Sequence, residues 1–136
     1  MYKGKVFTKN DYDRLQTLMD NTDLVARVGP TNVKSLKLGL THCRLVDPRE
    51  IRPNIVTMNS TICLKNLGNG KKQIVSLVFP QDCDKDGDKI NVFSRIGSQV
   101  LGSTTGTVIK PNPADEQYFV IEEILYQPES AGDYNL

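Results

Sequence analysis

Apolar residues in the first third of the chain recur at the spacing of an amphipathic helix. Tyr12, Leu15, Leu18 and Met19 fall on one face, with charged residues between them. The preceding Thr-Lys-Asn-Asp at residues 8–11 supplies side chains that cap a helix N-terminus. The pattern predicts a helix from about residue 10 to residue 21.

A second helical stripe follows a strong break in the pattern, the Gly-Pro pair at residues 29–30. From residue 31 or 32 onward, one face again carries apolar side chains: Val33, Leu36, Leu40 and Cys43. Residues 21–31 are expected to form the connecting loop. Two amphipathic helices joined by a short loop predict an antiparallel helical hairpin, a short coiled coil, whose apolar stripes cover each other or the neighbouring domain.

From residue 55 onward the period changes from 3.6 to 2, which is typical of strands. The apolar runs predict strands at residues 61–67, 73–79, 89–93, 107–110 and 118–126. Asn69-Gly70 favours the positive φ angles of a hairpin turn. Ser94 is placed to cap a short helix, and Gly102 is placed to end it.

This order of patterns predicts an α+β fold. An N-terminal helical hairpin occupies residues 1–53, and Arg52-Pro53-Asn54 marks its end. Residues 54–136 are expected to form a mostly antiparallel β-sheet domain with one short helix packed against it.

Composition narrows the class of protein. Of 136 residues, 38% are hydrophobic and 24% charged, as in globular domains and unlike disordered chains. A net charge of +1 does not supply the concentrated positive face of a nucleic-acid binder, so no sequence-specific DNA contact is expected. The sequence has no apolar run near the ~20 residues of a membrane span and no secretory leader pattern. We therefore expect a cytoplasmic protein with no membrane partner.

Four further residue types bear on chemistry. Cys43, Cys63 and Cys83 are odd in number and form no Cys-x-x-Cys pair, which favours reduced, mostly buried thiols over a disulfide or zinc site. Lysines 3, 5 and 9 alternate with aromatic residues and suit either phosphate contacts or, as we expect, a solvated terminus that lies on the domain. His42 has no nucleophile at a spacing that suggests a triad. Glu122 and Glu123 are neighbours in a strand and point to opposite faces, so they do not act on one substrate. No enzymatic activity and no cofactor are expected.

The segment from residue 82 to residue 88 resembles the start of a calcium-binding loop. Its carboxylates stand at positions 1, 3, 5 and 7, as Asp82, Asp84, Asp86 and Asp88, with Gly87 at position 6. Position 12, where a bidentate Glu is needed, is Phe93. The segment is interpreted as a solvated acidic turn, with weak divalent-ion binding as the alternative.

Four segments carry a resemblance to a known family. The opening of the sheet, Val56–Thr61, and the tail Tyr126–Leu136 closely resemble the Rnk family, regulators of nucleoside diphosphate kinase. Residues 89–94 and 96–102 resemble the strand–turn–helix segment that Rnk proteins share with the Gre transcript-cleavage factors. The resemblance covers residues 55–136 and, in layout, the helical hairpin before them.

The resemblance implies an N-terminal antiparallel coiled coil and a C-terminal domain like that of FK506-binding proteins. In Gre factors the C-terminal domain grips the rim of the RNA polymerase secondary channel, and an acidic pair at the coiled-coil tip helps to position a magnesium ion. Rnk proteins have a shorter arm and are understood to compete for the rim without cleaving RNA. Asp20 and Asp23 have the spacing of that pair, with helix capping as the alternative role of Asp23. A helix of roughly 18 Å at 1.5 Å per residue does not carry them to the polymerase active site.

By family position, six residues around the short helix are expected to contact the polymerase: Phe93, Ser94, Arg95, Ile96, Ser98 and Gln99. Phe93 and Ile96 would supply apolar contact area and Arg95 a charge-assisted bond to an acidic helix, with core packing as the alternative for Phe93. Most relatives have Pro where this chain has Arg95. Gly132 and Tyr134 of the tail are interpreted as structural, bending the chain and packing an aromatic ring on the sheet.

Together these inferences predict a polymerase-binding transcription regulator that catalyses nothing and influences the level of nucleoside diphosphate kinase. Direct binding to that kinase, prolyl isomerase activity and a calcium-responsive role are the alternatives. The isomerase is disfavoured because the chain has no Trp and only four Phe, scattered along the sequence.

Overall fold

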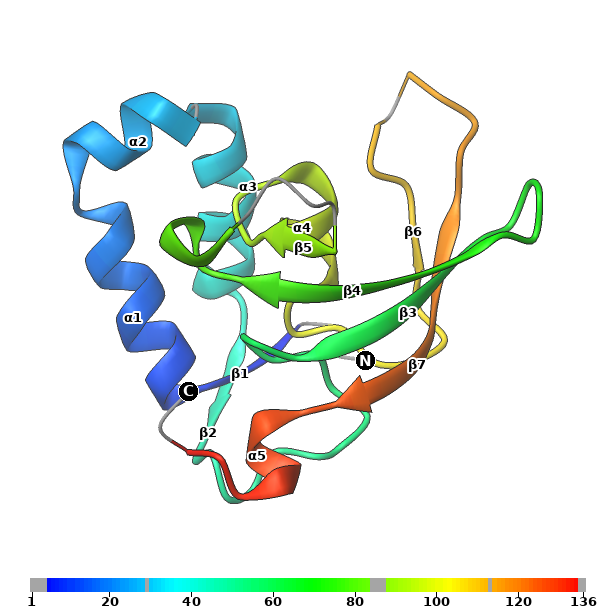
Figure 1. The fold of residues 1–136 in the computed structure, drawn as a ribbon. Helices are drawn as coiled ribbons and strands as arrows, with labels where there is room; N and C mark the ends of the chain where they lie inside the picture. Colours follow the sequence, from blue (N-terminus) through cyan, green and yellow to red (C-terminus); the bar gives the residue numbers. More distant parts are fainter. Residues whose placement is uncertain (1–4, 29, 84–87, 113, 135–136) are drawn as a thin grey trace.

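A helical arm lies beside a curled β-sheet in the computed structural model, which describes residues 5–28, 30–83, 88–112 and 114–134 (Figure 1). The N-terminal part contains β1 (Val6–Thr8), α1 (Lys9–Met19), α2 (Thr22–Val28), α3 (Pro30–Thr41) and β2 (Arg44–Val46). The C-terminal part contains β3 (Thr61–Asn66), β4 (Lys72–Val78), the 3₁₀ helix η1 (Pro80–Asp82), β5 (Lys89–Asn91), α4 (Arg95–Val100), β6 (Val108–Ile109), β7 (Phe119–Tyr126) and α5 (Pro128–Ala131). Of the helices described, none combines the length and the apolar character needed to cross a bilayer.

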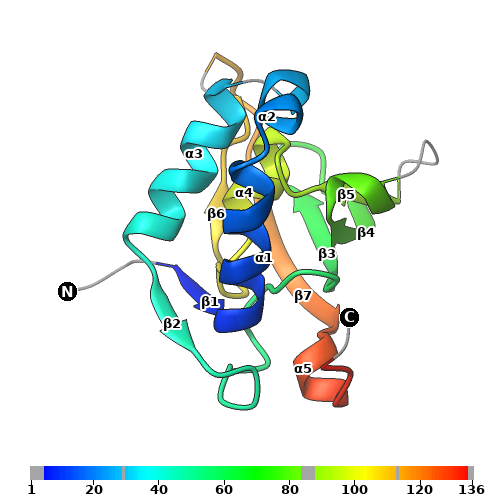
Figure 2. The ribbon, with the colours of Figure 1, turned by 90° about the vertical axis from the view of Figure 1, so that its left-hand side faces the viewer.

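The predicted helical hairpin is present: α1 and α3 run in opposite directions and stand side by side, with α4 behind them (Figures 1 and 2). Thr8 caps α1, since its Oγ1 accepts a hydrogen bond from the N–H of Asp11 at 3.1 Å. The expectation of a loop over residues 21–31 was wrong, because α2 fills most of it. The side chain of Asn21 caps this helix by accepting a hydrogen bond from the N–H of Leu24, and the Leu24 side chain is buried. The cap and the packing stabilise a short helix just before the Gly-Pro pair, where the sequence pattern indicated only a break.

β1 and β2 form a parallel pair that hydrophobic periodicity did not predict. The pairing joins Val6 to Arg44 and Thr8 to Val46, so the chain enters and leaves the arm through adjacent strands. Each strand has three residues, too few for a period-2 pattern to be recognised. The pairing places Val6–Thr8 on the domain, where the terminus was expected to lie, and Lys9 beside it is exposed. Lys3 lies outside the described residues.

The main sheet has the strand order β5-β4-β3-β7-β6. Its pairs are antiparallel except β4–β5, which is parallel, so the prediction of a mostly antiparallel sheet is confirmed. Gly70 has the positive φ expected for the β3–β4 turn, at 74°. The alternation in β3 directs Ile62 and Leu64 into the core, as predicted.

Buried apolar side chains from the arm and from the sheet belong to one cluster. Leu15 of α1 and Leu36 of α3 share this core with Met58, Ile62 and Ile121. The arm is therefore packed along much of its length. The domain boundary at residue 53 stays a prediction. The apolar core contains residues from both sides of this position.

Candidate functional site

The turn before α4 is built by a short chain of hydrogen bonds. The side-chain oxygen of Asn91 accepts from the N–H of Phe93, and its carbonyl accepts from the N–H of Ser94, both at 2.9 Å. Ser94 then caps the helix, because its Oγ accepts from the N–H of Gly97 at 2.9 Å. The cap predicted from sequence is confirmed, and it sets the direction in which α4 begins at Arg95.

Gly97 allows α4 to lie directly on the strand that precedes it. A Cβ at this position would stand 2.1 Å from the carbonyl oxygen of Asn91, well inside van der Waals contact. A side chain therefore cannot be placed here without moving the turn. Further along the helix, the amide of Gln99 donates to the carbonyl of Lys110 at 3.1 Å, which ties α4 to the chain that follows β6.

The six residues expected around this helix differ in exposure. Phe93 is 1% exposed and Ser98 is 7% exposed, so both lie in the core, and the packing alternative describes Phe93. Arg95 is exposed, while Ser94, Ile96 and Gln99 are half-buried. We refer to Ser94, Arg95, Ile96 and Gln99 as the α4 surface. Its predicted role in binding stays a prediction.

Both acidic residues of the expected arm tip lie at the far end of the hairpin. Asp20 ends α1, and Asp23 lies in the first turn of α2. Both are exposed. Asn21, between them, provides the side-chain cap of α2 that had been considered for Asp23.

The acidic segment is described only at its two ends. Asp82 closes η1 and is exposed, and the backbone carbonyl of Asp88 accepts from the N–H of Ser76 at 2.8 Å. Asp84 and Asp86 lie outside the described residues. Within the described ranges no group of three or more potential metal-ligating side chains is found. Weak ion binding here stays a prediction.

The remaining candidates for chemistry are surface groups. His42 and both members of the Glu122–Glu123 pair are exposed. Glu122 of β7 forms an ion pair across β3 with Lys72 of β4, with Nζ and Oε1 2.8 Å apart. Ion pairs of this kind, which are open to water, contribute little to stability.

The three cysteines form no disulfide with one another and differ in burial. Cys63 is buried in β3 and Cys43 is half-buried beyond α3. The expectation of mostly buried thiols was wrong for Cys83, which is exposed after η1. Cys83 follows directly on η1, whose residues are not part of the core, so its side chain is open to solvent.

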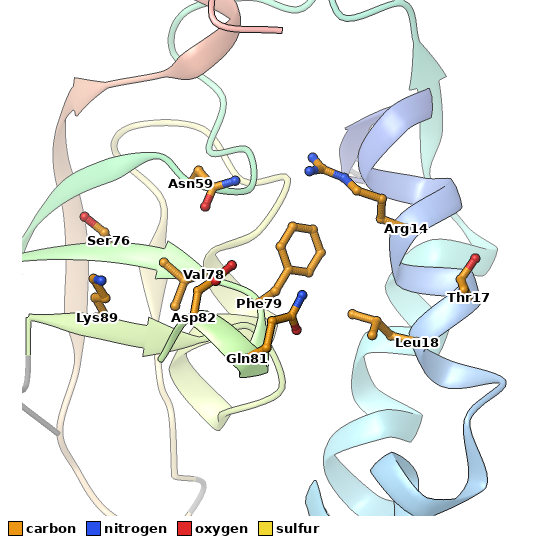
Figure 3. Close-up of a pocket in the computed structure, with 10 residues that line it drawn as sticks. All are labelled: Arg14, Thr17, Leu18, Asn59, Ser76, Val78, Phe79, Gln81, Asp82 and Lys89. Atoms are coloured by element: carbon orange, nitrogen blue, oxygen red, sulfur yellow. The ribbon is translucent and has the colours of Figure 1, made fainter. Parts of the chain in front are cut away.

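An open cleft of about 760 Å³ separates α1 from the β4–β5 edge of the sheet (Figure 3). From the α1 wall, Arg14 reaches over the ring of Phe79 on the opposite wall, 4.7 Å from its centroid, and Leu18 faces Gln81 across the gap (Figure 3). Of the ten residues that line the cleft, Phe79 alone is aromatic. This lining lacks the aromatic walls that were expected of a prolyl isomerase. Sequence reasoning missed the cleft because its walls come from segments far apart in the chain.

Beside the cleft, a buried carboxylate joins the arm to the opening of the sheet. Asp11 of α1 is 1% exposed; one of its oxygens accepts from the N–H of Met58 at 3.0 Å and the other from Arg14 at 2.6 Å. Burial raises the pKa of Asp11, and the Met58 N–H and the Arg14 charge oppose that rise. Asp11 had been assigned only to a helix cap, so this contact was not predicted.

The tail also reaches this segment. Glu129 of α5 accepts from the hydroxyl of Thr57 at 2.7 Å, and burial raises the pKa of this carboxyl. The amide of Gln127 donates to the carbonyls of Arg52 and Ile55, at 2.8 and 2.7 Å. The two stretches that carried the sequence resemblance, Val56–Thr61 and the tail, are thus hydrogen-bonded to each other. This junction gives Thr57, Gln127 and Glu129 a structural role.

The structural interpretation of the tail is confirmed in one respect and wrong in another. Gly132 ends α5 with a φ of 80°, the left-handed conformation that favours glycine, and so bends the chain as expected. Tyr134 does not pack on the sheet. It is 42% exposed and lies beside Arg49, whose guanidinium is 5.9 Å from the ring centroid.

Comparison with known proteins agrees with this architecture. Residues 50–126 match the family model described as transcription elongation factor, GreA/GreB, C-terminal. The chain is 30% identical over 129 residues to the regulator of nucleoside diphosphate kinase of Escherichia coli strain K12, a match that covers 93% of this chain and 92% of that protein. It is also 30% identical over 96 residues to the transcription elongation factor GreA of Chlorobium phaeobacteroides, covering 68% of this chain and 60% of GreA.

A solved structure is similar as well. The prokaryotic transcription elongation factor GreA/GreB from Nitrosomonas europaea superposes with a TM-score of 0.77 at 30% identity, over 92% of this chain and all of that one. The match includes the arm and the sheet together, so the likeness extends beyond the C-terminal part. This chain therefore belongs to the GreA/GreB family of transcription elongation factors and, within it, to the Rnk group of regulators of nucleoside diphosphate kinase.

Proposed function

We propose that this chain is a transcription regulator that docks on RNA polymerase at the rim of the secondary channel, through the α4 surface, and does not cleave transcripts. Membership of the GreA/GreB family supports a role in transcription. The observation that carries the docking proposal is that Arg95 is exposed at the start of α4. The helix is held in place there by the Ser94 cap and by the close packing of Gly97 against Asn91.

The chemistry of the α4 surface suits an acidic partner. Arg95 presents an unburied guanidinium, which forms short, directional hydrogen bonds with carboxylates. Ile96 beside it is half-buried and offers apolar contact area. Phe93 supports the surface from within the core and contributes no contact area of its own. An acidic helix on the polymerase rim is the partner that these groups fit.

The arm supports the second half of the proposal, the absence of cleavage. α1 has 11 residues and measures roughly 16 Å at 1.5 Å per residue. Leu15 and Leu24 on the inner face of the arm are buried, so the arm is held beside the sheet. With α4 docked on the rim, Asp20 and Asp23 stay far from the polymerase active site. Metal-assisted cleavage needs groups placed within hydrogen-bond reach, and this arrangement does not supply them.

Docking is tested by measuring the affinity of the purified chain for core RNA polymerase. Arg95→Glu replaces an attractive charge by a repulsive one, and we expect binding about tenfold weaker or worse. Arg44→Glu, an equal charge change at an exposed position of β2, is the matched control and should bind like the wild type. A Gre factor should compete with the wild-type chain. Absence of binding, or equal binding by the Arg95 and Arg44 variants, would contradict the proposal.

The name of the Escherichia coli relative raises the question of direct contact with nucleoside diphosphate kinase. We infer that the effect on the kinase is indirect and follows from transcription in the cytoplasm. Affinity between the purified chain and the purified kinase distinguishes the two routes. Measurable binding that Arg95→Glu leaves unchanged would favour the direct route.

A further inference from the structure

Lys5, in the segment that leads into β1, closes the C-terminal end of α4. The last four carbonyls of a helix have no partner within it. Here the carbonyl of Gly97 accepts from the N–H of Leu101 and that of Val100 from the N–H of Ser103. The two carbonyls between them, of Ser98 and Gln99, accept from Nζ of Lys5 at 2.7 and 2.8 Å.

α4 depends on such partners because it is short. It has six residues, which is below the length at which a helix is stable by itself. Its N-terminal end is held by Ser94, and its C-terminal end is held by Lys5 together with the hydroxyl of Ser103, which also donates to the carbonyl of Gln99 at 2.8 Å. A positive charge at the C-terminal end is also favoured by the helix dipole.

The stem of Lys5 lies between the arm and α4. On the arm side, a Cβ added at Gly39 of α3 would stand 3.7 Å from Cδ of Lys5. On the other side, Gly102, which follows α4, approaches so closely that an added Cβ would stand 2.9 Å from Cβ of Lys5. The backbone is fixed on both sides too, since the N–H of Arg44 donates to the carbonyl of Lys5 and the N–H of Val6 donates to that of Gly102.

The charge of Lys5 is retained in this position at neutral pH. Burial lowers the pKa of Lys5 to about 8, so most molecules still carry the ammonium group that donates to the two carbonyls. Lys5 had been grouped with terminal lysines that face solvent or phosphate. Its ammonium group is instead directed to the end of α4.

We propose that Lys5 is the positioning residue for polymerase docking: it sets the orientation of the α4 surface relative to the arm by joining α3, β1 and the C-terminal end of α4. The proposal rests on docking through α4. Lys5 itself touches no partner, and its effect on binding is transmitted through the helix. Loss of its two hydrogen bonds frees the last turn of α4, and the α4 surface then no longer presents Arg95 and Ile96 in one orientation.

The test compares four variants with the wild type. Lys5→Met keeps the length of the side chain and removes the donors, whereas Lys5→Arg keeps charge and donors. Lys9→Met removes the same charge from an exposed position at the start of α1. Thr57→Val removes buried hydrogen bonds at the α5 end of the molecule and controls for a general loss of stability. Polymerase affinity is measured well below the thermal midpoint of every variant, and amide hydrogen exchange of α4 is followed in the free chain.

We expect Lys5→Met to bind polymerase about tenfold more weakly, with faster exchange confined to the amides of α4. Lys5→Arg, Lys9→Met and Thr57→Val should each bind within about threefold of the wild type. Wild-type affinity in a folded Lys5→Met variant, or an equal loss in Thr57→Val, overturns the proposal. If Lys5→Met does not fold, Lys5→Gln replaces it, and wild-type affinity there has the same meaning.

The two proposals fail in different ways. If the wild-type chain does not bind polymerase, docking through α4 is wrong and the positioning role in docking is lost with it. If the wild type binds and Arg95→Glu does not, while Lys5→Met binds normally, docking stands and the role of Lys5 is overturned. The exchange of the α4 amides then reports whether Lys5 holds the helix at all.

Discussion

The carboxylate of Asp11 on α1 accepts a hydrogen bond from the backbone N–H of Met58 at 3.0 Å, a contact between residues 47 positions apart in the chain. Met58 lies in the turn that opens the sheet, and the hydroxyl of Thr57 beside it donates to Glu129 of α5. One short segment thus connects the arm, the sheet and the tail. These hydrogen bonds join parts of the molecule that also share one apolar core.

Removing the Asp11 carboxylate should destabilise the fold. Asp11→Ala leaves the buried N–H of Met58 without an acceptor and takes away the carboxylate that Arg14 binds, for a loss of about 2 to 3 kcal/mol in the free energy of unfolding. Urea denaturation measures it. Asp13→Ala, an exposed site on the same helix, is the control and should change stability by less than about 0.5 kcal/mol. Equal effects at the two positions would show that the contact with Met58 is unimportant.

Two helical glycines should respond in opposite directions to alanine. Gly97→Ala places a Cβ 2.1 Å from the carbonyl oxygen of Asn91 and should cost about 3 kcal/mol or more, or prevent folding. Gly39→Ala in α3 has its nearest neighbour at 3.7 Å, an ordinary contact, and should stabilise the chain by about 0.5 to 1 kcal/mol through helix propensity. Thermal denaturation of both variants checks the contrast. A tolerated Gly97→Ala would mean that α4 does not lie on the strand end.

The carboxyl of Glu129 should make stability depend on pH. Because burial raises its pKa above the ordinary value of 4.5, the folded chain keeps this proton at pH values where the unfolded chain has lost it. The free energy of unfolding therefore decreases as the pH rises from 4.5 through the raised pKa. Glu129→Gln can still accept from Thr57 and should show a shallower decrease in urea titrations across this range. The remaining slope comes from Asp11, whose pKa burial also raises. An unchanged slope in Glu129→Gln would contradict the assignment.

Transcript cleavage should be absent. Stalled elongation complexes incubated with the purified chain are expected to yield no shortened RNA beyond the intrinsic activity of polymerase, with a GreA protein as the positive control. Asp20→Asn with Asp23→Asn should leave that result unchanged, because the α1 helix is too short to carry the tip to the active site. Cleavage by the wild type that disappears in the double variant would overturn the non-catalytic half of the proposed function.

Local patterns predicted the elements in which neighbouring residues decide the conformation. The cap at Ser94 and the alternation of Ile62 and Leu64 in β3 were read correctly because each depends on residues within a few positions of one another. α2 was missed because the Gly-Pro pair marked a break, whereas the cap from Asn21 and the burial of Leu24 stabilise a helix before that break.

The sequence alone also did not decide which side chains would be exposed on the surface. Phe93, expected as a contact or as core, is core, and the α4 surface consequently rests on Arg95 and its neighbours. Lys5 was expected in solvent and is instead hydrogen-bonded to the end of α4. The apolar ring of Phe93 suits a core or a contact surface, and the Lys5 side chain, with its apolar stem and charged end, suits either solvent or a partly buried site. The packing of distant segments decided both positions.

By itself the sequence determined the class of fold, most of the strands, the short capped helix and the family, since periodicity, caps and signature segments are properties of local stretches. Only the tertiary structure decided the parallel pairing of β1 with β2, the contact of Asp11 with Met58 and the closure of α4 by Lys5. These contacts join residues separated by tens of positions, and their formation depends on the packing of the complete core. Local propensity carries no information on which distant groups that packing brings together.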